Sequence, residues 1–188
     1  MVFIELGHFG LEVTTTVHPT GAVAVPISFG WHPYVTLPGV PRAAMSVDLP
    51  ERAELELDAR MLPTGNVRNV HATTVLLGEG PMENALDDAY RLGDGVIDRS
   101  FVLRGEDAAG VERAVRVDIG DGYSHGQAYA PRGRAFAAFE PMTAPINALV
   151  SGDHRWVQPA DQFSATFAIA VPAADPPYAG ASARPRGA

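Results

Sequence analysis

The sequence of 188 residues contains no cysteine. A chain without thiols forms no disulfide, no thiolate metal site and no cysteine nucleophile, so these chemistries are excluded. Lysine is also absent, and every basic residue apart from histidine is an arginine. We interpret the missing lysine as a compositional bias of the source rather than as a sign of particular chemistry.

Long apolar runs are missing too, since no stretch approaches the length of a membrane span. Residues 1–6 (MVFIEL) lack the basic segment and the long apolar core of a secretory signal. The formal net charge is -8, whereas a nucleic-acid surface needs a basic face. We therefore expect a cytoplasmic protein without membrane or nucleic-acid partners.

Several motifs that identify enzyme classes do not occur in the sequence. There is no GxSxG, HExxH, P-loop or dinucleotide-binding fingerprint. No cluster of histidines and carboxylates has a metal-ligand spacing, so no metal site is predicted. No window combines a helical period with capping residues, which argues against a helical fold.

What the chain does contain is a series of short apolar segments with period-two alternation. Residues 11–17, 115–119 and 163–171 show this alternation most cleanly, and β-branched residues are frequent in them. Many short strands separated by Gly and Pro turns indicate an all-β protein, an antiparallel sandwich or barrel. Strands are predicted at residues 11–17, 22–29, 44–49, 54–57, 100–103, 115–119, 127–130, 135–140 and 163–171.

A chain of this length suits one domain, which we predict at residues 1–171. Residues 172–188 are rich in Pro, Ala, Gly and Arg without apolar periodicity, and this predicts a disordered tail. Residues 11–17 and 22–29 flank a turn and are expected to form a hairpin. The polar, weakly patterned residues 66–84 predict a long loop.

One carboxylate, Glu140, lies at the end of an apolar segment. Pro141 cannot donate to a sheet ladder, so the strand is predicted to stop there. A lone carboxylate is costly to bury unless it is paired or used. From this segment alone, a Glu that reaches water at the sheet rim and a functional Glu are equally acceptable interpretations.

His32 has the most distinctive surroundings of the six histidines. It lies between Trp31 and Pro33, next to Tyr34, and a rigid aromatic surround can orient an imidazole and shift its pKa. A structural histidine packed on Trp31 is the alternative interpretation. The remaining histidines are predicted to lie at the surface: His8, His18, His71, His125 and His154.

Two adjacent carboxylates, Asp87 and Asp88, precede Ala-Tyr and are open to two interpretations. They cap a turn, or one of them has a functional role. One His, one Glu and one Asp on separate strands suit proton transfer between two oxygen atoms of a small polar substrate. Trp31 and Tyr34 are suited to stack on the apolar face of a sugar ring.

At this point the sequence resembles the aldose 1-epimerase (galactose mutarotase) family. The resemblance runs in order from about residue 9 to residue 171. The segments that carry it are residues 10–17 (GLEVTTTV), 27–34 (ISFGWHPY), 86–90 (LDDAY) and 139–145 (FEPMTAP), followed by Asn147 and Ala148.

The resemblance implies a galactose mutarotase-like β-supersandwich that interconverts the α and β anomers of an aldohexose without a metal or cofactor. His32 matches the family's general acid and Glu140 its general base. Asp87 matches the Asp that binds sugar hydroxyls, with Asp88 as the alternative. The acid and base are expected to stand several ångströms apart across the sugar ring, without a mutual hydrogen bond.

The chain departs from the family's pattern at its N-terminal side. Family members begin with a block of strands that carries a further Arg and His of the sugar site, and no counterpart of this block is found here. Exposed sheet edges and a homo-oligomer are therefore expected. Two alternatives remain open: a non-catalytic carbohydrate-binding module, and a hexose-phosphate 1-epimerase that uses Arg132 or Arg134, although a solvated turn explains these two arginines better.

Overall fold

The computed structural model describes residues 1–93 and 98–172. The described residues form antiparallel sheets with three short helices, so the predicted all-β antiparallel sandwich is confirmed. The predicted tail at residues 172–188 lies outside the described residues except for Pro172. Among the described residues, no helix has the length and hydropathy that a membrane crossing requires.

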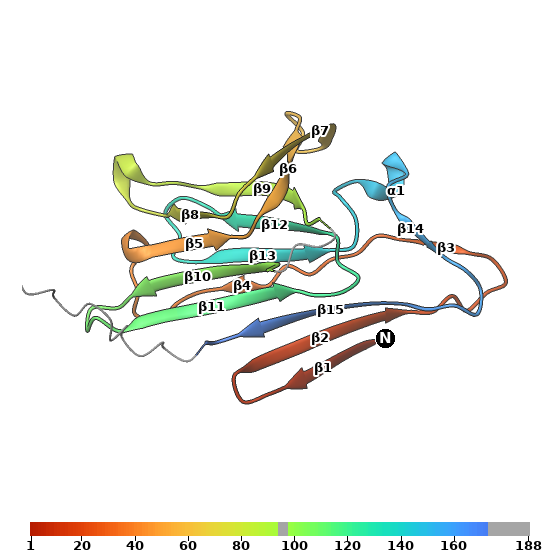
Figure 1. Cartoon of the computed structure of the whole chain (residues 1–188), viewed down its shortest axis with the longest axis horizontal. Coiled ribbons are helices and arrows are strands. Elements are labelled where there is room, and N and C mark those ends of the chain that lie inside the picture. Colours follow the sequence, from red (N-terminus) through yellow and green to blue (C-terminus); the bar gives the residue numbers. More distant parts are fainter. Residues whose placement is uncertain (94–97, 173–188) are drawn as a thin grey trace, which may run out of the picture.

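The larger sheet has seven strands and runs along the lower side of the molecule in Figure 1. Neighbouring strands in it are all antiparallel. In spatial order the strands are β1 (Val2–Leu6), β2 (Gly10–Val17), β15 (Phe163–Ala170), β11 (Glu112–Ile119), β10 (Ser100–Glu106), β5 (Met45–Leu49) and β8 (Thr73–Leu76).

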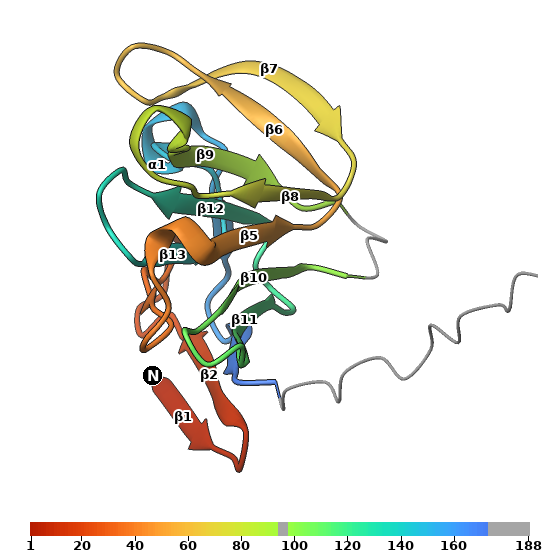
Figure 2. The ribbon, with the colours of Figure 1, turned by 90° about the vertical axis from the view of Figure 1, so that its left-hand side faces the viewer.

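The second sheet has six strands, and a separate two-stranded ribbon joins β14 (Arg155–Val157) to β3 (Val25–Ile27). In Figure 2 the hairpin of β6 (Arg52–Leu57) and β7 (Pro63–Val70) lies at one end of the molecule and β1 at the opposite end. The strands of the second sheet are, in order, β4 (Tyr34–Val35), β13 (Ala137–Met142), β12 (His125–Ala130), β9 (Leu86–Arg91), β6 (Arg52–Leu57) and β7 (Pro63–Val70). The helices are η1 (Arg42–Ala44), η2 (Gly80–Met82) and α1 (Ala148–Ser151).

Aromatic side chains join the two sheets across the core. Phe101 of β10 contacts Tyr90 of β9 with ring centroids 6.0 Å apart and Phe139 of β13 at 5.6 Å, both edge to face. All three rings are fully buried. Such contacts contribute about 0.5–1.5 kcal/mol each beyond the burial of apolar area.

Strand β12 shows how the second sheet separates its two faces. Gly126, Ala128 and Ala130 are buried against the core, whereas the intervening residues His125, Gln127 and Tyr129 are only partly buried. A Cβ on Gly126 would lie 3.0 Å from the ring of Phe101, so glycine lets this ring pack against β12. The polar residues of β12 therefore project from the face of the sheet that points away from the core.

The predicted hairpin of residues 11–17 with residues 22–29 is wrong. Strand β2 pairs with β1 and β15, whereas the strand in the second segment, β3, pairs with β14. The predicted loop at residues 66–84 is also wrong, because it contains most of β7 and all of β8. Six of the eight residues of β7 are exposed, so this edge strand lacks the apolar alternation that would have identified it.

Pro141 does not end its strand, contrary to prediction. Strand β13 continues to Met142, and Pro141 pairs with Gly126 of β12. On the other side, β4 pairs only with Ala137 and Ala138. Because β4 does not extend as far as Pro141, the missing N–H of this proline removes no hydrogen bond between β13 and β4. The carbonyl of Pro141 accepts a hydrogen bond from the backbone N–H of Trp31 at 3.0 Å.

Strand β1 is an edge strand whose apolar side chains are uncovered. Phe3, Ile4 and Leu6 are 61%, 58% and 82% exposed. An exposed apolar edge of this kind matches the expectation from the sequence, since unpaired strand edges favour association. A homo-oligomer that covers this edge stays a prediction.

Candidate active site

The outward face of the second sheet brings together polar residues that are far apart in the sequence. Gln127 of β12 lies directly opposite Glu140 of β13. Two residues further along β12, Tyr129 lies opposite Asp87 of β9. Residues directly opposite each other in a sheet project from the same face, so these four side chains share one surface.

The loop between β3 and β4 places His32 over this surface. Gly30 forms a β-bridge with Met142, and a Cβ on Gly30 would lie 2.7 Å from the carbonyl oxygen of Pro141. Any other residue at this position would push the loop away from β13. The adjoining hydrogen bond from the backbone N–H of Trp31 to the Pro141 carbonyl then fixes the backbone position of the next residue, His32.

Thr143, which directly follows β13, holds the same loop at the same end of the strand. Its backbone N–H donates to the carbonyl of Phe29 at 2.9 Å, and its hydroxyl donates to the same carbonyl at 3.0 Å. The backbone N–H of Phe29 also lies 3.0 Å from the Thr143 hydroxyl oxygen. These hydrogen bonds attach Phe29, two positions before Trp31, to Thr143, three positions after Glu140, and so fix the loop to the end of β13.

His32 and Glu140 are in direct contact, contrary to the predicted separation. His32 Nε2 lies 3.0 Å from Glu140 Oε1, with side chains that are 47% and 12% exposed. The physical reason is that the loop contacts bring the imidazole over β13, and a largely buried carboxylate is stabilised by a hydrogen-bonding partner. The ring of His32 also stacks on Tyr34 with centroids 4.7 Å apart.

Burial raises the pKa of the Glu140 carboxyl above its ordinary value. The neighbouring His32 opposes this rise, whereas the carboxylate of Asp87 adds to it. A carboxylate with a raised pKa is a stronger base, and such shifts are concentrated at functional sites. Glu140 is thus a carboxylate whose environment increases its capacity to accept a proton.

Asp87 and Asp88 lie on opposite faces of β9. Asp87 Oδ1 accepts a hydrogen bond from the side-chain amide of Gln127 at 2.7 Å, so it belongs to the surface that carries Glu140. Asp88 instead lies 3.4 Å from the hydroxyl of Tyr90, whose ring is buried in the core. The structure therefore places Asp87, and not Asp88, beside the other candidate residues.

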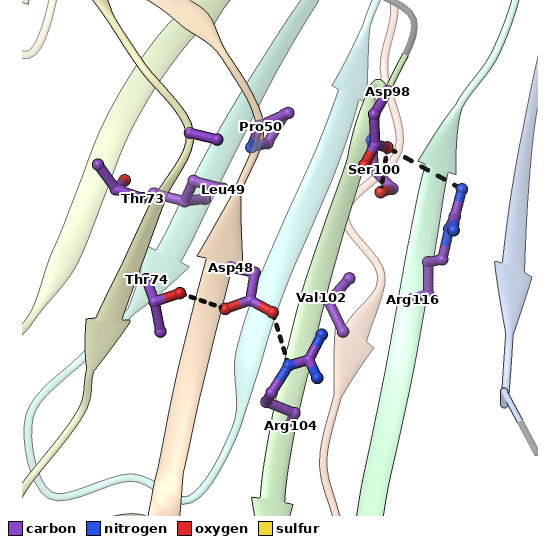
Figure 3. Close-up of a pocket in the computed structure, with 11 residues that line it drawn as sticks. Asp48, Leu49, Pro50, Thr73, Thr74, Asp98, Ser100, Val102, Arg104 and Arg116 are labelled. Carbon is purple, nitrogen blue, oxygen red and sulfur yellow. Dashed lines mark hydrogen bonds and ion pairs between the residues drawn. The ribbon is translucent and has the colours of Figure 1, made fainter. Parts of the chain in front are cut away.

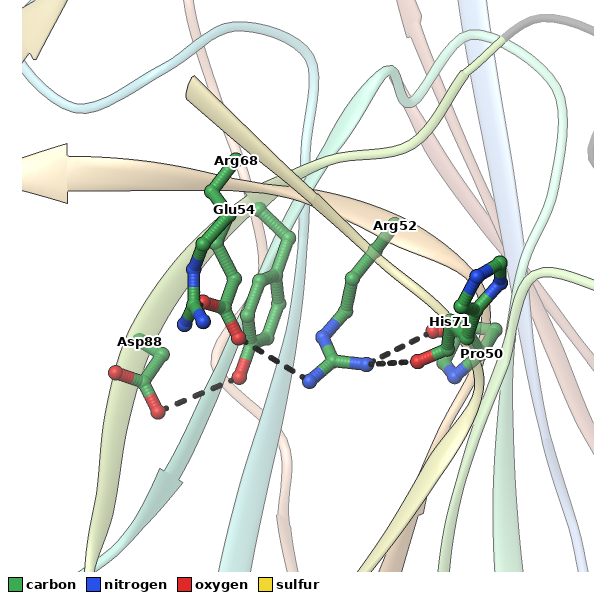
Figure 4. A network of polar contacts seen from close by, with 7 residues as sticks. Pro50, Arg52, Glu54, Arg68, His71 and Asp88 are labelled. Carbon is green, nitrogen blue, oxygen red and sulfur yellow. Dashed lines mark hydrogen bonds and ion pairs between the residues drawn. The ribbon is translucent and has the colours of Figure 1, made fainter. Parts of the chain in front are cut away.

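Asp88 belongs to a separate polar network at the junction of β6, β7 and β9 (Figure 4). Its centre is Arg52, which is 5% exposed and donates to the carbonyls of Pro50 at 3.0 Å and His71 at 3.3 Å. Arg52 also pairs with Glu54 at 3.3 Å and lies over the ring of Tyr90. Partial burial and the Glu54 carboxylate raise the pKa of Asp88.

The two predicted aromatic ligands occupy different environments. The ring of Tyr34 is 61% exposed beside His32, where it is open to solvent. Trp31 packs against the core, since its indole N–H donates to the Thr15 hydroxyl at 3.0 Å and its ring lies 5.9 Å from that of Phe167. Tyr34 is the better placed of the two to contact a ligand.

A pocket of about 310 Å³ opens beside the His32–Glu140 contact. We call it the His32–Glu140 pocket. Asn147 lines it with a left-handed backbone (φ 65°), a conformation that Asn tolerates better than most residues. The lining residues are Ser28, Phe29, Gly30, Trp31, His32, Glu140, Met142, Ala144, Pro145, Ile146 and Asn147.

A second pocket, of about 390 Å³, lies on the solvent face of the larger sheet; we call it the outer pocket (Figure 3). Asp48 lies between Thr74 and Arg104 there, with contacts of 2.7 and 2.6 Å. Arg116 contacts Asp98 at 4.0 Å. Each arginine therefore has a carboxylate partner inside the pocket.

Other predicted sites are resolved by their position. Arg132 and Arg134 are exposed in the turn between β12 and β13, as a solvated turn requires. Within the described residues, no three His, Asp or Glu side chains are grouped as a metal site would need.

His125 and His154 are half-buried rather than at the surface, because β12 and the segment after α1 are covered by neighbouring residues.

The residues that sequence reasoning missed are Gln127, Tyr129, Thr143 and His125. The segment at residues 127–130 was correctly predicted as a strand, but its pairing with β13 and β9 was not. The polar members of β12 alternate with Gly and Ala, and this alternation was the available signal.

The comparisons with known proteins concern structure alone. No protein-family profile and no curated protein matches the sequence. A galactose mutarotase-like protein from Clostridium acetobutylicum is 21% identical with a TM-score of 0.71, and a galactose mutarotase related enzyme from Lactobacillus acidophilus is 17% identical with a TM-score of 0.72. An aldose epimerase homologue from C. elegans is 15% identical with a TM-score of 0.68.

These similarities cover 91%, 92% and 91% of this chain but only 55%, 61% and 58% of the respective solved chains. The chain thus spans little more than half of the length of these proteins. At such low identity the comparison concerns the fold, and it agrees with the antiparallel sheets described above. The chain has the galactose mutarotase-like fold.

Proposed function

We propose that this protein is an aldose 1-epimerase, which interconverts the α and β anomers of an aldohexose. The observation that carries the proposal is the gathering of His32, Glu140, Gln127 and Asp87 on one face of the second sheet. A carboxylate, an imidazole and hydroxyl-binding groups around a polar surface suit proton transfer on a sugar. The structural similarity to mutarotase-like proteins supports the same reaction class.

Glu140 is the general base of this proposal. Burial raises the pKa of its carboxyl, so the carboxylate accepts a proton from the C1 hydroxyl more readily than an exposed Glu does. It lies on β13 between β12 and the His32 loop, which restricts its side chain to this surface. Glu140 takes the hydroxyl proton as the bond between C1 and the ring oxygen breaks.

His32 is the general acid. Its imidazole donates a proton to the ring oxygen, and the products of this step are the open-chain aldehyde, a protonated Glu140 and a neutral His32. Rotation about the C1–C2 bond exposes the other face of the aldehyde, and closure returns both protons to their original groups. His32 is 47% exposed, so its ring is accessible to a sugar from the solvent side.

Gln127 and Asp87 hold the sugar hydroxyls. Their mutual hydrogen bond of 2.7 Å leaves the second oxygen of Asp87 and the carbonyl of Gln127 as acceptors. The exposed ring of Tyr34 offers an apolar surface to the sugar, whereas Trp31 forms part of the pocket wall. The substrate is thereby bound through hydroxyl groups and one aromatic face.

A second candidate is a non-catalytic carbohydrate-binding module. It is favoured by the 3.0 Å contact between His32 Nε2 and Glu140 Oε1, because two proton-transfer groups that bind each other do not stand on either side of a sugar ring. In this case Asp87 and Gln127 bind a sugar, but the anomers interconvert no faster than in water.

Polarimetry distinguishes the two candidates. Freshly dissolved α-glucose and α-galactose are followed with and without the protein, and binding is measured separately by chemical-shift changes in the protein. Acceleration of mutarotation supports the epimerase. Sugar binding without acceleration supports the binding module, and neither binding nor acceleration with any aldohexose contradicts both.

A further inference from the structure

A second imidazole, that of His125, occupies the same face as Glu140 and Gln127. His125 begins β12 and lies opposite Met142 of β13 and Arg91 of β9. Gln127 and Glu140 form the next outward-facing pair along the same strands. Two residues along a strand correspond to about 7 Å, so His125 lies within the span of one hexose ring from Glu140.

The hydrogen bonds around His125 determine its tautomer. The hydroxyl of Ser124 lies 3.1 Å from the carbonyl of Thr143 and donates its one hydrogen to that oxygen. The same hydroxyl oxygen lies 2.9 Å from His125 Nδ1. Because the hydroxyl proton is already used, both contacts are satisfied only if Nδ1 carries a hydrogen and donates it to Ser124. In the neutral ring Nε2 is then an acceptor.

Burial and the neighbouring Arg91 keep the ring of His125 neutral. The pKa of His125 is lowered to about 4, mainly by burial and in smaller part by the guanidinium of Arg91 on β9. The carboxylate of Asp153, after α1, partly opposes this. The β13 neighbour, Met142, carries no charge. At neutral pH the imidazole therefore presents an unprotonated Nε2.

Arg91 complements this acceptor with donors. Its guanidinium forms no ion pair or hydrogen bond with the described residues, and its side chain is exposed directly across from His125. A hydroxyl group both donates and accepts a hydrogen bond, so an acceptor beside a donor matches it. The pair is suited to a neutral polyol rather than to a cation.

We propose that His125 and Arg91 form a second hydroxyl-binding subsite, in which Nε2 of His125 accepts a hydrogen bond from a sugar hydroxyl. This subsite extends the site of the proposed function and rests on that function only in requiring that the chain bind a sugar. His125 orients the sugar over Glu140 and is not itself the acid or the base. It therefore acts in recognition, beside the groups assigned to proton transfer.

Nitrogen-15 NMR of the whole chain at pH 7 tests this proposal directly. The long-range coupling pattern of the His125 ring is expected to show a proton on Nδ1 and none on Nε2. Addition of D-glucose or D-galactose is expected to shift the Nε2 resonance of His125. A proton on Nε2, or bound sugar that moves the Gln127 side-chain signal and leaves His125 Nε2 unchanged, overturns the proposal.

Variants provide a second readout that does not depend on catalysis. His125→Leu removes the acceptor and is expected to weaken sugar binding about 5- to 100-fold, whereas His125→Gln keeps an acceptor and is expected to retain most of the affinity. His154→Gln is the matched control, since this half-buried histidine contacts the carbonyl of Ala148 and lies outside β12. Equal affinities in the His125→Leu and wild-type proteins, with both folded by circular dichroism, contradict the subsite.

The failure of this proposal and of the proposed function are distinguishable. If a sugar binds and shifts the His125 resonance but mutarotation is not accelerated, the subsite is supported and the epimerase is contradicted. Accelerated mutarotation with no effect at His125 removes the subsite alone. Absence of binding by every aldohexose contradicts both.

Discussion

The His32–Glu140 pocket and the outer pocket, which lie beside different sheets, differ in how their charges are paired. In the outer pocket, Arg104 and Arg116 each contact a carboxylate (Figure 3). In the His32–Glu140 pocket, the carboxylate is 12% exposed and its partner is an imidazole, which is charged only when protonated. The outer pocket is the larger of the two, at about 390 Å³ against 310 Å³.

The pairing of charges, and not the size of the pocket, favours one of the two pockets as the candidate reactive site. Partly exposed arginine–carboxylate pairs satisfy one another and contribute little to stability or reactivity. A mostly buried carboxylate with a raised pKa keeps a capacity to take up a proton. The smaller pocket is therefore the better candidate for chemistry.

The largest effect is expected from removal of the base. Glu140→Gln preserves the shape of the side chain but cannot accept a proton, so mutarotation measured by polarimetry is expected to fall about 10²- to 10⁴-fold. Asp48→Asn in the outer pocket is the matched control and is expected to leave the rate unchanged. An equal loss of mutarotation rate in the two variants would show that the two pockets do not differ in function.

Removal of the proposed acid is expected to have the next largest effect. His32→Asn keeps a polar group but cannot protonate the ring oxygen, which predicts a loss of about 10²- to 10³-fold in rate. The variant also removes the interaction that lowers the pKa of Glu140. The pKa of Glu140 is then higher, so the acidic limb of the remaining pH–rate profile is expected to move to higher pH; an unmoved limb argues that the two groups are not coupled.

Asp87 and Asp88 provide a comparison between the two faces of one strand. Asp87→Asn is expected to weaken sugar binding by about 1–3 kcal/mol, because a hydroxyl loses its charged acceptor. Asp88→Asn changes the Arg52 network and is expected to leave the sugar affinity as it is. Isothermal titration with the bound aldose measures both, and the reverse pattern would assign the ligand role to Asp88.

The last prediction has no effect at neutral pH and concerns stability at acid pH. The pKa of His125 is lowered from 6.5 to about 4 in the folded chain, so the unfolded chain binds more protons between these values. Its contribution is present above pH 6.5 and is lost as pH falls towards 4, at no more than about 1.4 kcal/mol per pH unit. The free energy of unfolding, measured by urea denaturation at a series of pH values between 4 and 6.5, is expected to depend less steeply on pH in His125→Gln than in the wild-type protein. An identical slope in both proteins excludes His125 as the cause.

The strands that face the core were the most predictable part of the fold. Alternation at residues 11–17, 115–119 and 163–171 corresponds to β2, β11 and β15, because one buried and one exposed face impose a period of two. Strands β1 and β7 were missed, since most of their side chains are exposed and burial imposes no pattern on them.

The candidate site was only partly predictable. The sequence directed attention to His32, Glu140 and Asp87 through a family resemblance, and the structure places all three near one surface. It did not indicate Gln127 or His125, because their relevance depends on which strands lie beside β12. The sequence of one strand does not show which distant segments pair with it.

The sequence by itself determined the all-β character and the core-facing strands, because side-chain alternation is a local property of each strand. It also determined that no thiol chemistry occurs, since the chain has no cysteine. Only the tertiary structure decided that His32 touches Glu140 and that Asp87 and Asp88 face opposite sides. These relations follow from loop contacts and sheet register between segments up to about a hundred residues apart, where the free energy depends on packing that no single segment contains.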